Sequence, residues 1–94
     1  MYNTEMHKLI ALLVKADIPF EICPFTIDGE GTWQIAVPNK AECIIDAVSH
    51  KFSYGGDKGL IEILGSALDE MNDVVGWLSG EEAFEHFKAT YKGK

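Results

Sequence analysis

The sequence predicts a single α+β domain: an N-terminal helix, a mostly antiparallel sheet of about five strands, and a C-terminal helix. Two patterns indicate this class. Apolar residues recur at helical spacing near both ends of the chain, and short apolar segments between them are separated by turn-forming residues. With 94 residues, 47% of them hydrophobic, the chain has the size and composition of one globular core. We therefore expect residues 1–94 to fold as one domain.

The first predicted element is an amphipathic helix. Its apolar residues at helical spacing are Met6, Leu9, Ile10, Leu13 and Val14. Asn3 or Thr4 can cap its N-terminus. We expect it to end near Ala16, because Pro19 follows shortly afterwards.

The next two segments predict a β-hairpin. Strands over residues 20–26 and 32–37 flank the turn-forming run 28–31, which reads Asp-Gly-Glu-Gly. The residues of the second strand that then share one face are Trp33, Ile35 and Val37. Pro24 cannot donate a hydrogen bond to a neighbouring strand, so it indicates an edge strand or a bulge. Pro38 is expected to end the second strand.

The middle of the chain allows two interpretations. Residues 41–54 fit a helical stripe, and Asn39 with Glu42 would form a capping box for that helix. Their β-branched residues favour a strand instead, and we prefer the strand. Residues 60–71 have the same ambiguity, but Gly65 would weaken a helix. We expect a strand followed by a loop there, with a glycine-rich turn leading into it.

A short strand over residues 73–78 is predicted to lead into the final helix. Ser79-Gly80-Glu81-Glu82 has the residues of a capping box at the right spacing, and acids in a first turn suit the helix dipole. The apolar face of this helix consists of Ala83, Phe84, Phe87 and Tyr91. We expect both helices to cover a face of the sheet.

The charge of the chain restricts its partners. It has 15 acidic residues and 8 basic ones, for a net charge of −7, and all of the basic residues are lysine. Arginine provides the planar fork that binds phosphates and base edges, so its absence argues against direct binding of nucleic acid or of an anionic membrane. A basic or neutral protein partner fits better, although a negative charge can also serve solubility alone.

Catalytic, metal and targeting signals are lacking in the sequence. Cys23 and Cys43 are too few for a disulfide framework and are expected to be buried free thiols. With Asp46 and His50 they supply the residue types of a nucleophilic or metal site, but their spacings match no ligand pattern. No apolar run is long enough for a membrane span or a signal peptide. We therefore expect a cytoplasmic protein, not an enzyme, with no metal or cofactor.

The main candidate site is an acidic surface with an aromatic residue. Two acidic groups flank Trp77 in the sequence, and the complete candidate set is Asp69, Glu70, Asp73, Trp77, Glu81, Glu82 and Glu85. Opposite charge accelerates association with a basic groove, and an aromatic side chain can anchor the complex. The predicted function is therefore a protein-binding module. The simpler alternative is a solvated helix face.

Three further arrangements remain open. The glycine-rich turn could bind an anionic ligand or nucleotide through backbone amides, with Ser53, Tyr54, Gly55, Gly56 and Lys58 as its residues. A plain hairpin turn is the alternative to that site. A homodimer could form through strand edges or through apolar surface around Phe25 and Trp33. Pairing of residues 43–54 with 60–64 would bring Asp46, His50 and Glu62 close together.

Several short motifs extend from about residue 18 onward. They are Trp33-Gln34-Ile35 with Pro38, His50 with Ser53-Tyr54-Gly55, Leu60-Ile61-Glu62-Ile63-Leu64-Gly65, and Gly76-Trp77-Leu78 with Glu81-Glu82-Ala83-Phe84. Together they resemble small uncharacterised phage and prophage proteins of Firmicutes. That group has Gly-Tyr-Leu-Thr-Ala-Glu-Glu where this chain has Gly76-Trp77-Leu78-Ser79-Gly80-Glu81-Glu82. The resemblance implies no catalytic residue. It implies a protein that inhibits a host factor, such as a CRISPR nuclease or another nucleic-acid enzyme.

Overall fold

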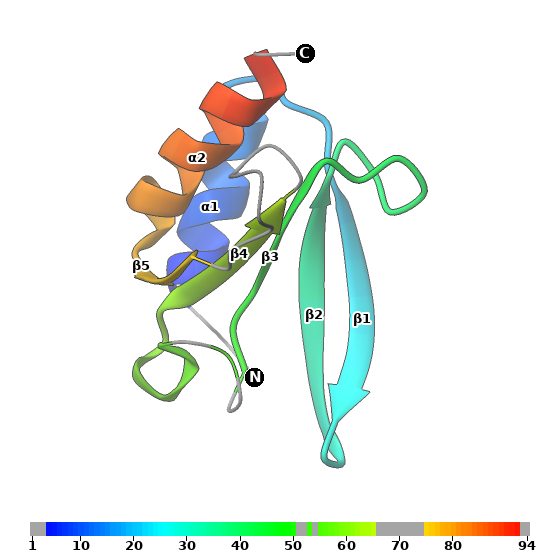
Figure 1. Cartoon of the computed structure of the whole chain (residues 1–94), viewed down its shortest axis with the longest axis vertical. Coiled ribbons are helices and arrows are strands. Elements are labelled where there is room, and N and C mark those ends of the chain that lie inside the picture. The colour runs from blue at the N-terminus through cyan, green and yellow to red at the C-terminus, as the bar shows by residue number, and fades with distance from the viewer. Residues whose placement is uncertain (1–3, 51–52, 54, 66–74, 93–94) are drawn as a thin grey trace.

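The computed structural model describes residues 4–50, 53, 55–65 and 75–92, and shows two helices side by side next to a five-stranded sheet (Figure 1). The elements are α1 (Thr4–Lys15), β1 (Glu21–Ile27), β2 (Glu30–Val37), β3 (Ile45–Val48), a short 3-10 helix η1 (Gly56–Lys58), β4 (Ile61–Gly65), β5 (Val75–Leu78) and α2 (Gly80–Lys92). The strands follow the order β1-β2-β3-β4-β5, and every pair is antiparallel. The predicted α+β class is confirmed.

Helix α1 buries one stripe of side chains and ends where the sequence predicts. Its buried residues are Met6, Leu9 and Leu13. At its C-terminus Asp17 has a positive φ of 60°. The N–H of Ile18 bonds to the carbonyl of Leu13 at 3.0 Å, and that of Asp17 bonds to Val14 at 3.1 Å. These two bonds form a Schellman motif, which satisfies the last carbonyls of the helix and directs the chain towards β1.

The β1–β2 hairpin has a shorter turn than the sequence predicts. Only Asp28 and Gly29 form it, with φ of 52° and 80°, and β2 begins at Glu30 instead of Thr32. Positive φ at both central residues is the geometry of a type I′ turn, which matches the twist of the flanking strands. Pro24 lies in edge strand β1, as expected. Strand β2 ends at Val37, and a cis peptide bond to Pro38 follows.

Between β2 and β4 the strand interpretation is correct where the structure describes the chain. The N–H of Glu42 bonds to Asn39 Oδ1 at 2.8 Å, and Asn39 Nδ2 donates to Glu42 Oε1 at 3.3 Å, as in a capping box. No helix follows this turn. The chain instead pairs with β2, beginning with a 2.8 Å bond from the N–H of Ile44 to the carbonyl of Val37. Pairing on both sides holds β3 in the middle of the sheet.

Strands β4 and β5 are also confirmed within the described residues. Strand β4 covers Ile61–Gly65, and β5 covers the described part of the strand predicted over 73–78. The loop predicted after β4 lies outside the described residues.

The predicted capping box starts α2. The N–H of Ser79 donates to Glu82 Oε1 at 2.9 Å, and the N–H of Glu82 donates to Ser79 Oγ at 3.1 Å. Glu5 of α1 also accepts the N–H of Gly80 at 2.8 Å, so one helix caps the other. A Cβ on Gly80 would lie 2.6 Å from the carbonyl oxygen of Glu5, which shows how closely the two helices approach each other. Neither described helix has the length and apolar character needed to cross a membrane.

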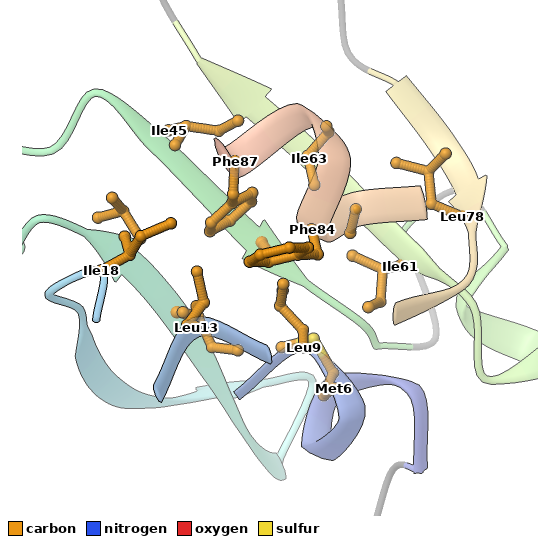
Figure 2. Close-up of a cluster of buried hydrophobic side chains, with 14 residues drawn as sticks. Met6, Leu9, Leu13, Ile18, Ile45, Ile61, Ile63, Leu78, Phe84 and Phe87 are labelled. Atoms are coloured by element: carbon orange, nitrogen blue, oxygen red, sulfur yellow. The ribbon is translucent and has the colours of Figure 1, made fainter. Parts of the chain in front are cut away.

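A single core joins the helices to one face of the sheet (Figure 2). The helices contribute Met6, Leu9, Leu13, Ala83, Phe84 and Phe87, and the strands contribute Ile35, Val37, Ile45, Ala47, Ile61, Ile63 and Leu78. The apolar face predicted for the final helix is therefore confirmed, with Tyr91 packed against the core. The described residues form a two-layer arrangement with both helices on the same side.

Candidate functional site

The strand register separates a core face from an open face of the sheet. Ile35 pairs with Ala47, which pairs with Ile63, and all three are buried in the core. Successive residues of a strand point to opposite faces, so the alternate residues lie on the side away from the helices. This open face, on which no described helix packs, consists of Glu21, Cys23, Phe25, Ile27, Glu30, Thr32, Gln34, Ala36, Asp46, Val48, Glu62 and Leu64.

A partly buried carboxylate lies near the middle of the open face. Gln34 donates a hydrogen bond from Nε2 to Asp46 Oδ2. Burial raises the pKa of Asp46, the bond from Gln34 opposes that rise, and the nearby Glu62 carboxylate adds to it. An acid whose pKa is raised by folding is harder to ionise in the native state, so its charge lowers stability. Asp46 is thus a partly buried carboxylate whose negative charge is disfavoured by burial, although the side chain of Gln34 and the backbone of Leu64 both bond to it.

The predicted proximity of Asp46, His50 and Glu62 is met in part. Strands β3 and β4 do pair, with Val48 opposite Glu62, and the Glu62 carboxylate helps to raise the pKa of Asp46. His50 lies beyond the end of β3. Its ring packs edge-on against Phe25 of β1, with ring centroids 6.0 Å apart.

The two cysteines differ in environment. Cys23 is buried on the open face, as expected, but Cys43 is exposed, which corrects the expectation that both are buried. Cys43 lies in the turn before β3, where its Sγ contacts the carbonyl of Ile45 at 3.4 Å. Partial burial of this thiol and the negative charge of Asp46 raise the pKa of Cys43, which disfavours the nucleophilic thiolate. Among the described residues, no group of His, Cys, Asp or Glu is arranged to hold a metal ion.

Trp77 lies in an unusual backbone conformation on the edge strand β5. Ile61 pairs with Leu78 and Ile63 with Val75, so Gly76 and Trp77 together face the single residue Glu62. This is a β-bulge, a feature that often redirects a side chain. Trp77 has a φ of 62° and is 56% exposed. A bulky residue rarely adopts a positive φ, and strained residues of this kind concentrate at functional sites.

The acids that follow Trp77 have different roles. Glu81, Glu82 and Glu85 are all exposed on the first turns of α2. Glu82 belongs to the capping box, and Glu85 forms an ion pair with Lys88 at 3.4 Å. The remaining acids of the predicted site, Asp69, Glu70 and Asp73, lie outside the described residues.

The glycine-rich turn uses many of its amides internally. The N–H groups of Gly56, Lys58, Gly59 and Leu60 all bond to backbone carbonyls within the turn, at 2.9 to 3.1 Å, and the acceptors are Ser53, Gly55 and Gly56. These amides are therefore engaged in the turn and are not presented to an anion. Ser53 is buried, and its hydroxyl bonds to both backbone groups of His50 at 2.8 and 2.9 Å.

Gly55 and Gly56, which also belong to that predicted site, lie very close to neighbouring backbone. A Cβ on Gly56 would lie 1.7 Å from the His50 carbonyl oxygen, and one on Gly55 would lie 2.9 Å from Trp77 Cα. Glycine at both positions lets the turn pack against its neighbours. Lys58 is exposed, and Tyr54 lies outside the described residues. The turn thus supports the backbone beside Trp77.

The sequence interpretation missed the open face as a candidate surface. A signal was present: the five strands contain four charged residues, Glu21, Glu30, Asp46 and Glu62, and all four are acids. The register places all of them on the open face. Comparison of the chain with protein-family models, curated proteins and solved structures found no match.

Proposed function

We propose that this chain is a non-enzymatic protein-binding module that docks onto a basic partner through Trp77 and the acids near it. The observation that carries the proposal is the exposed side chain of Trp77 on a left-handed residue at a strand edge. Aromatic residues dominate binding hot spots, and a surrounding acidic surface accelerates association with a basic partner. The net charge of −7 and the absence of arginine support the same kind of partner.

Within this class, we propose a phage or mobile-element inhibitor of a host defence or nucleic-acid enzyme, in the manner of an anti-CRISPR protein. The resemblance of the sequence motifs to phage proteins supports this role. Enzymes that bind nucleic acid have basic grooves, and an acidic protein surface can compete with phosphates for them. The raised pKa of Cys43, caused by partial burial and by Asp46, argues against a nucleophilic thiolate at this residue.

Affinity capture tests this proposal. The tagged chain is incubated with lysate of a bacterial host, washed at low and then at high salt, and the retained proteins are identified by mass spectrometry. We expect one basic, salt-sensitive partner. Its retention should fall roughly tenfold or more in Trp77→Asn, as expected for the loss of a hot-spot aromatic residue. Asparagine adopts positive φ readily, so the backbone at this position is preserved.

A charge-matched pair of variants separates the proposed site from net charge. Glu81→Gln with Glu85→Gln removes two of the proposed binding acids on α2 and should weaken retention. Asp17→Asn with Asp28→Asn removes two charges elsewhere, at positions with φ of 60° and 52° that asparagine tolerates, and should not. Equal retention by all of these proteins, or no retained partner, would contradict the proposal. Thermal unfolding of each variant shows whether it is folded.

A further inference from the structure

Trp77 lies between two residues of β5 that strand pairing holds in place. Leu78 is buried in the core and pairs with Ile61. Val75, on the other side of Trp77, pairs with Ile63 and packs against the core. Between these pairs the bulge adds one residue to β5, and the φ of 62° at Trp77 costs free energy for a bulky side chain. Such a conformation persists only where its surroundings determine it, so the contacts of the Trp77 backbone decide where the indole points.

Gly55 of the glycine-rich turn lies against this backbone. A Cβ at residue 55 would lie 2.9 Å from Trp77 Cα and 3.1 Å from Trp77 N. Both are backbone atoms, which cannot move aside as the end of a flexible side chain can. Gly55 is itself buried and has a φ of 87°. Two residues with positive φ, from separate segments of the chain, thus pack backbone to backbone.

Hydrogen bonds hold the turn in place on both sides of Gly55. The carbonyl of Gly55 accepts the N–H of Lys58 at 3.0 Å and that of Leu60 at 2.9 Å. The hydroxyl of Ser53 bonds to both backbone groups of His50 at 2.8 and 2.9 Å. These bonds join the turn to the residues after β3 and to the start of β4. The turn is therefore an anchored support for the bulged part of β5.

We infer that Gly55 is a positioning residue for the proposed binding site: it lets the turn lie against the Trp77 backbone and thereby fixes the direction of the indole. This inference rests on the proposed function and adds the residue that orders its aromatic anchor. An anchor that is ordered before binding loses less conformational entropy when the partner arrives, which favours affinity. The glycine-rich turn, whose amides are engaged internally, then contributes to the Trp77 surface.

Gly55→Ala and Gly59→Ala form a matched pair that tests this inference. Both glycines cap the helix η1, with φ of 87° and 74°, so alanine is strained at either position. Only a Cβ at residue 55 meets Trp77, because one at residue 59 meets nothing within 4 Å. Nuclear magnetic resonance measures the Trp77 conformation through its intraresidue HN–Hα nuclear Overhauser effect, which is strong at positive φ. We expect Gly55→Ala to weaken this signal and to shift the Trp77 indole N–H resonance, and Gly59→Ala to leave both as in wild type.

Retention of the partner from lysate is the functional readout. It should fall roughly tenfold in Gly55→Ala and stay near the wild-type level in Gly59→Ala. Unchanged Trp77 signals or unchanged retention in Gly55→Ala would overturn the inference, and so would equal effects of the two variants. If thermal unfolding shows that Gly55→Ala is not folded, Ser53→Ala takes its place. It adds no atoms and removes the hydroxyl that anchors the turn, so it should shift the same Trp77 signals, and their constancy would overturn the inference.

The two proposals can fail separately. If Trp77→Asn loses the partner while Gly55→Ala keeps it, only this inference fails. If the wild-type chain captures no partner, the proposed function fails, and the resonance signals of Trp77 alone decide whether Gly55 positions its side chain.

Discussion

Gly80→Ala should destabilise the protein, although alanine is the better helix former. The Cβ of alanine would lie 2.6 Å from the Glu5 carbonyl oxygen and 2.7 Å from Lys8 Cβ, both on α1. The 2.6 Å contact is with backbone, so the helices must separate. Such overpacking costs about 1–3 kcal/mol. The bond from the N–H of Gly80 to Glu5 Oε1, 2.8 Å long, is weakened at the same time.

We expect a total loss of about 2–4 kcal/mol, because a hydrogen bond to a charged group adds about 1.5–3 kcal/mol when lost completely. In a domain of this size the thermal midpoint should then fall by roughly 10–20 °C. Urea unfolding followed by circular dichroism measures the change directly. Gly31→Ala is the control, since a Cβ there meets nothing within 4 Å. A Gly80→Ala protein as stable as wild type would refute the close helix contact.

Three other substitutions test separate parts of the structure. Asp17→Gly should raise the unfolding free energy by about 0.5–1 kcal/mol, because glycine adopts the left-handed conformation at a helix C-terminus more easily than aspartate; urea unfolding checks it. The stability of Asp46→Asn relative to wild type should increase as pH rises from about 3 to 7. In that range the native state of the wild type binds more protons than its unfolded state, because folding raises the pKa of Asp46, so only the wild type loses stability by this route. A difference independent of pH would contradict this. Gly56→Ala should lower the thermal midpoint strongly, since its Cβ would overlap the His50 carbonyl oxygen, which differential scanning calorimetry can measure.

Local sequence signals predicted the parts of the fold that depend on neighbouring residues. The capping box at Ser79 and Glu82 forms as expected, because both partners belong to one helical turn. The hairpin turn at Asp28 and Gly29 also forms, although it is tighter than predicted. In both cases the interacting groups are only a few residues apart, so no knowledge of the tertiary structure is needed.

The middle of the chain could not be assigned from periodicity alone. Ile44, Ile45 and Val48 satisfy both a helical stripe and a strand with β-branched residues. Pairing on both sides decides in favour of β3, and its partners β2 and β4 come from other parts of the chain. The Asn39–Glu42 interaction shows the same limit, because the reciprocal bonds of a capping box form there without a helix.

The candidate site was predictable only in part. Trp77 and the acids of α2 are neighbours in sequence, so they could be selected together. The open face became visible only through the register, which brings Asp46 and Glu62 from different strands to one side of the sheet. The positive φ of Trp77 depends on the bulge opposite Glu62 and could not be inferred from composition.

Fluorescence of Trp77 tests the central claim of a binding surface most directly. In a Trp33→Phe variant, Trp77 is the single tryptophan, and it is 56% exposed in the free protein. Titration with the partner retained from lysate should shift its emission to shorter wavelength in a saturable way, because binding removes water from the indole. Saturable binding that leaves the emission maximum unchanged would show that the partner contacts another surface and would contradict the account.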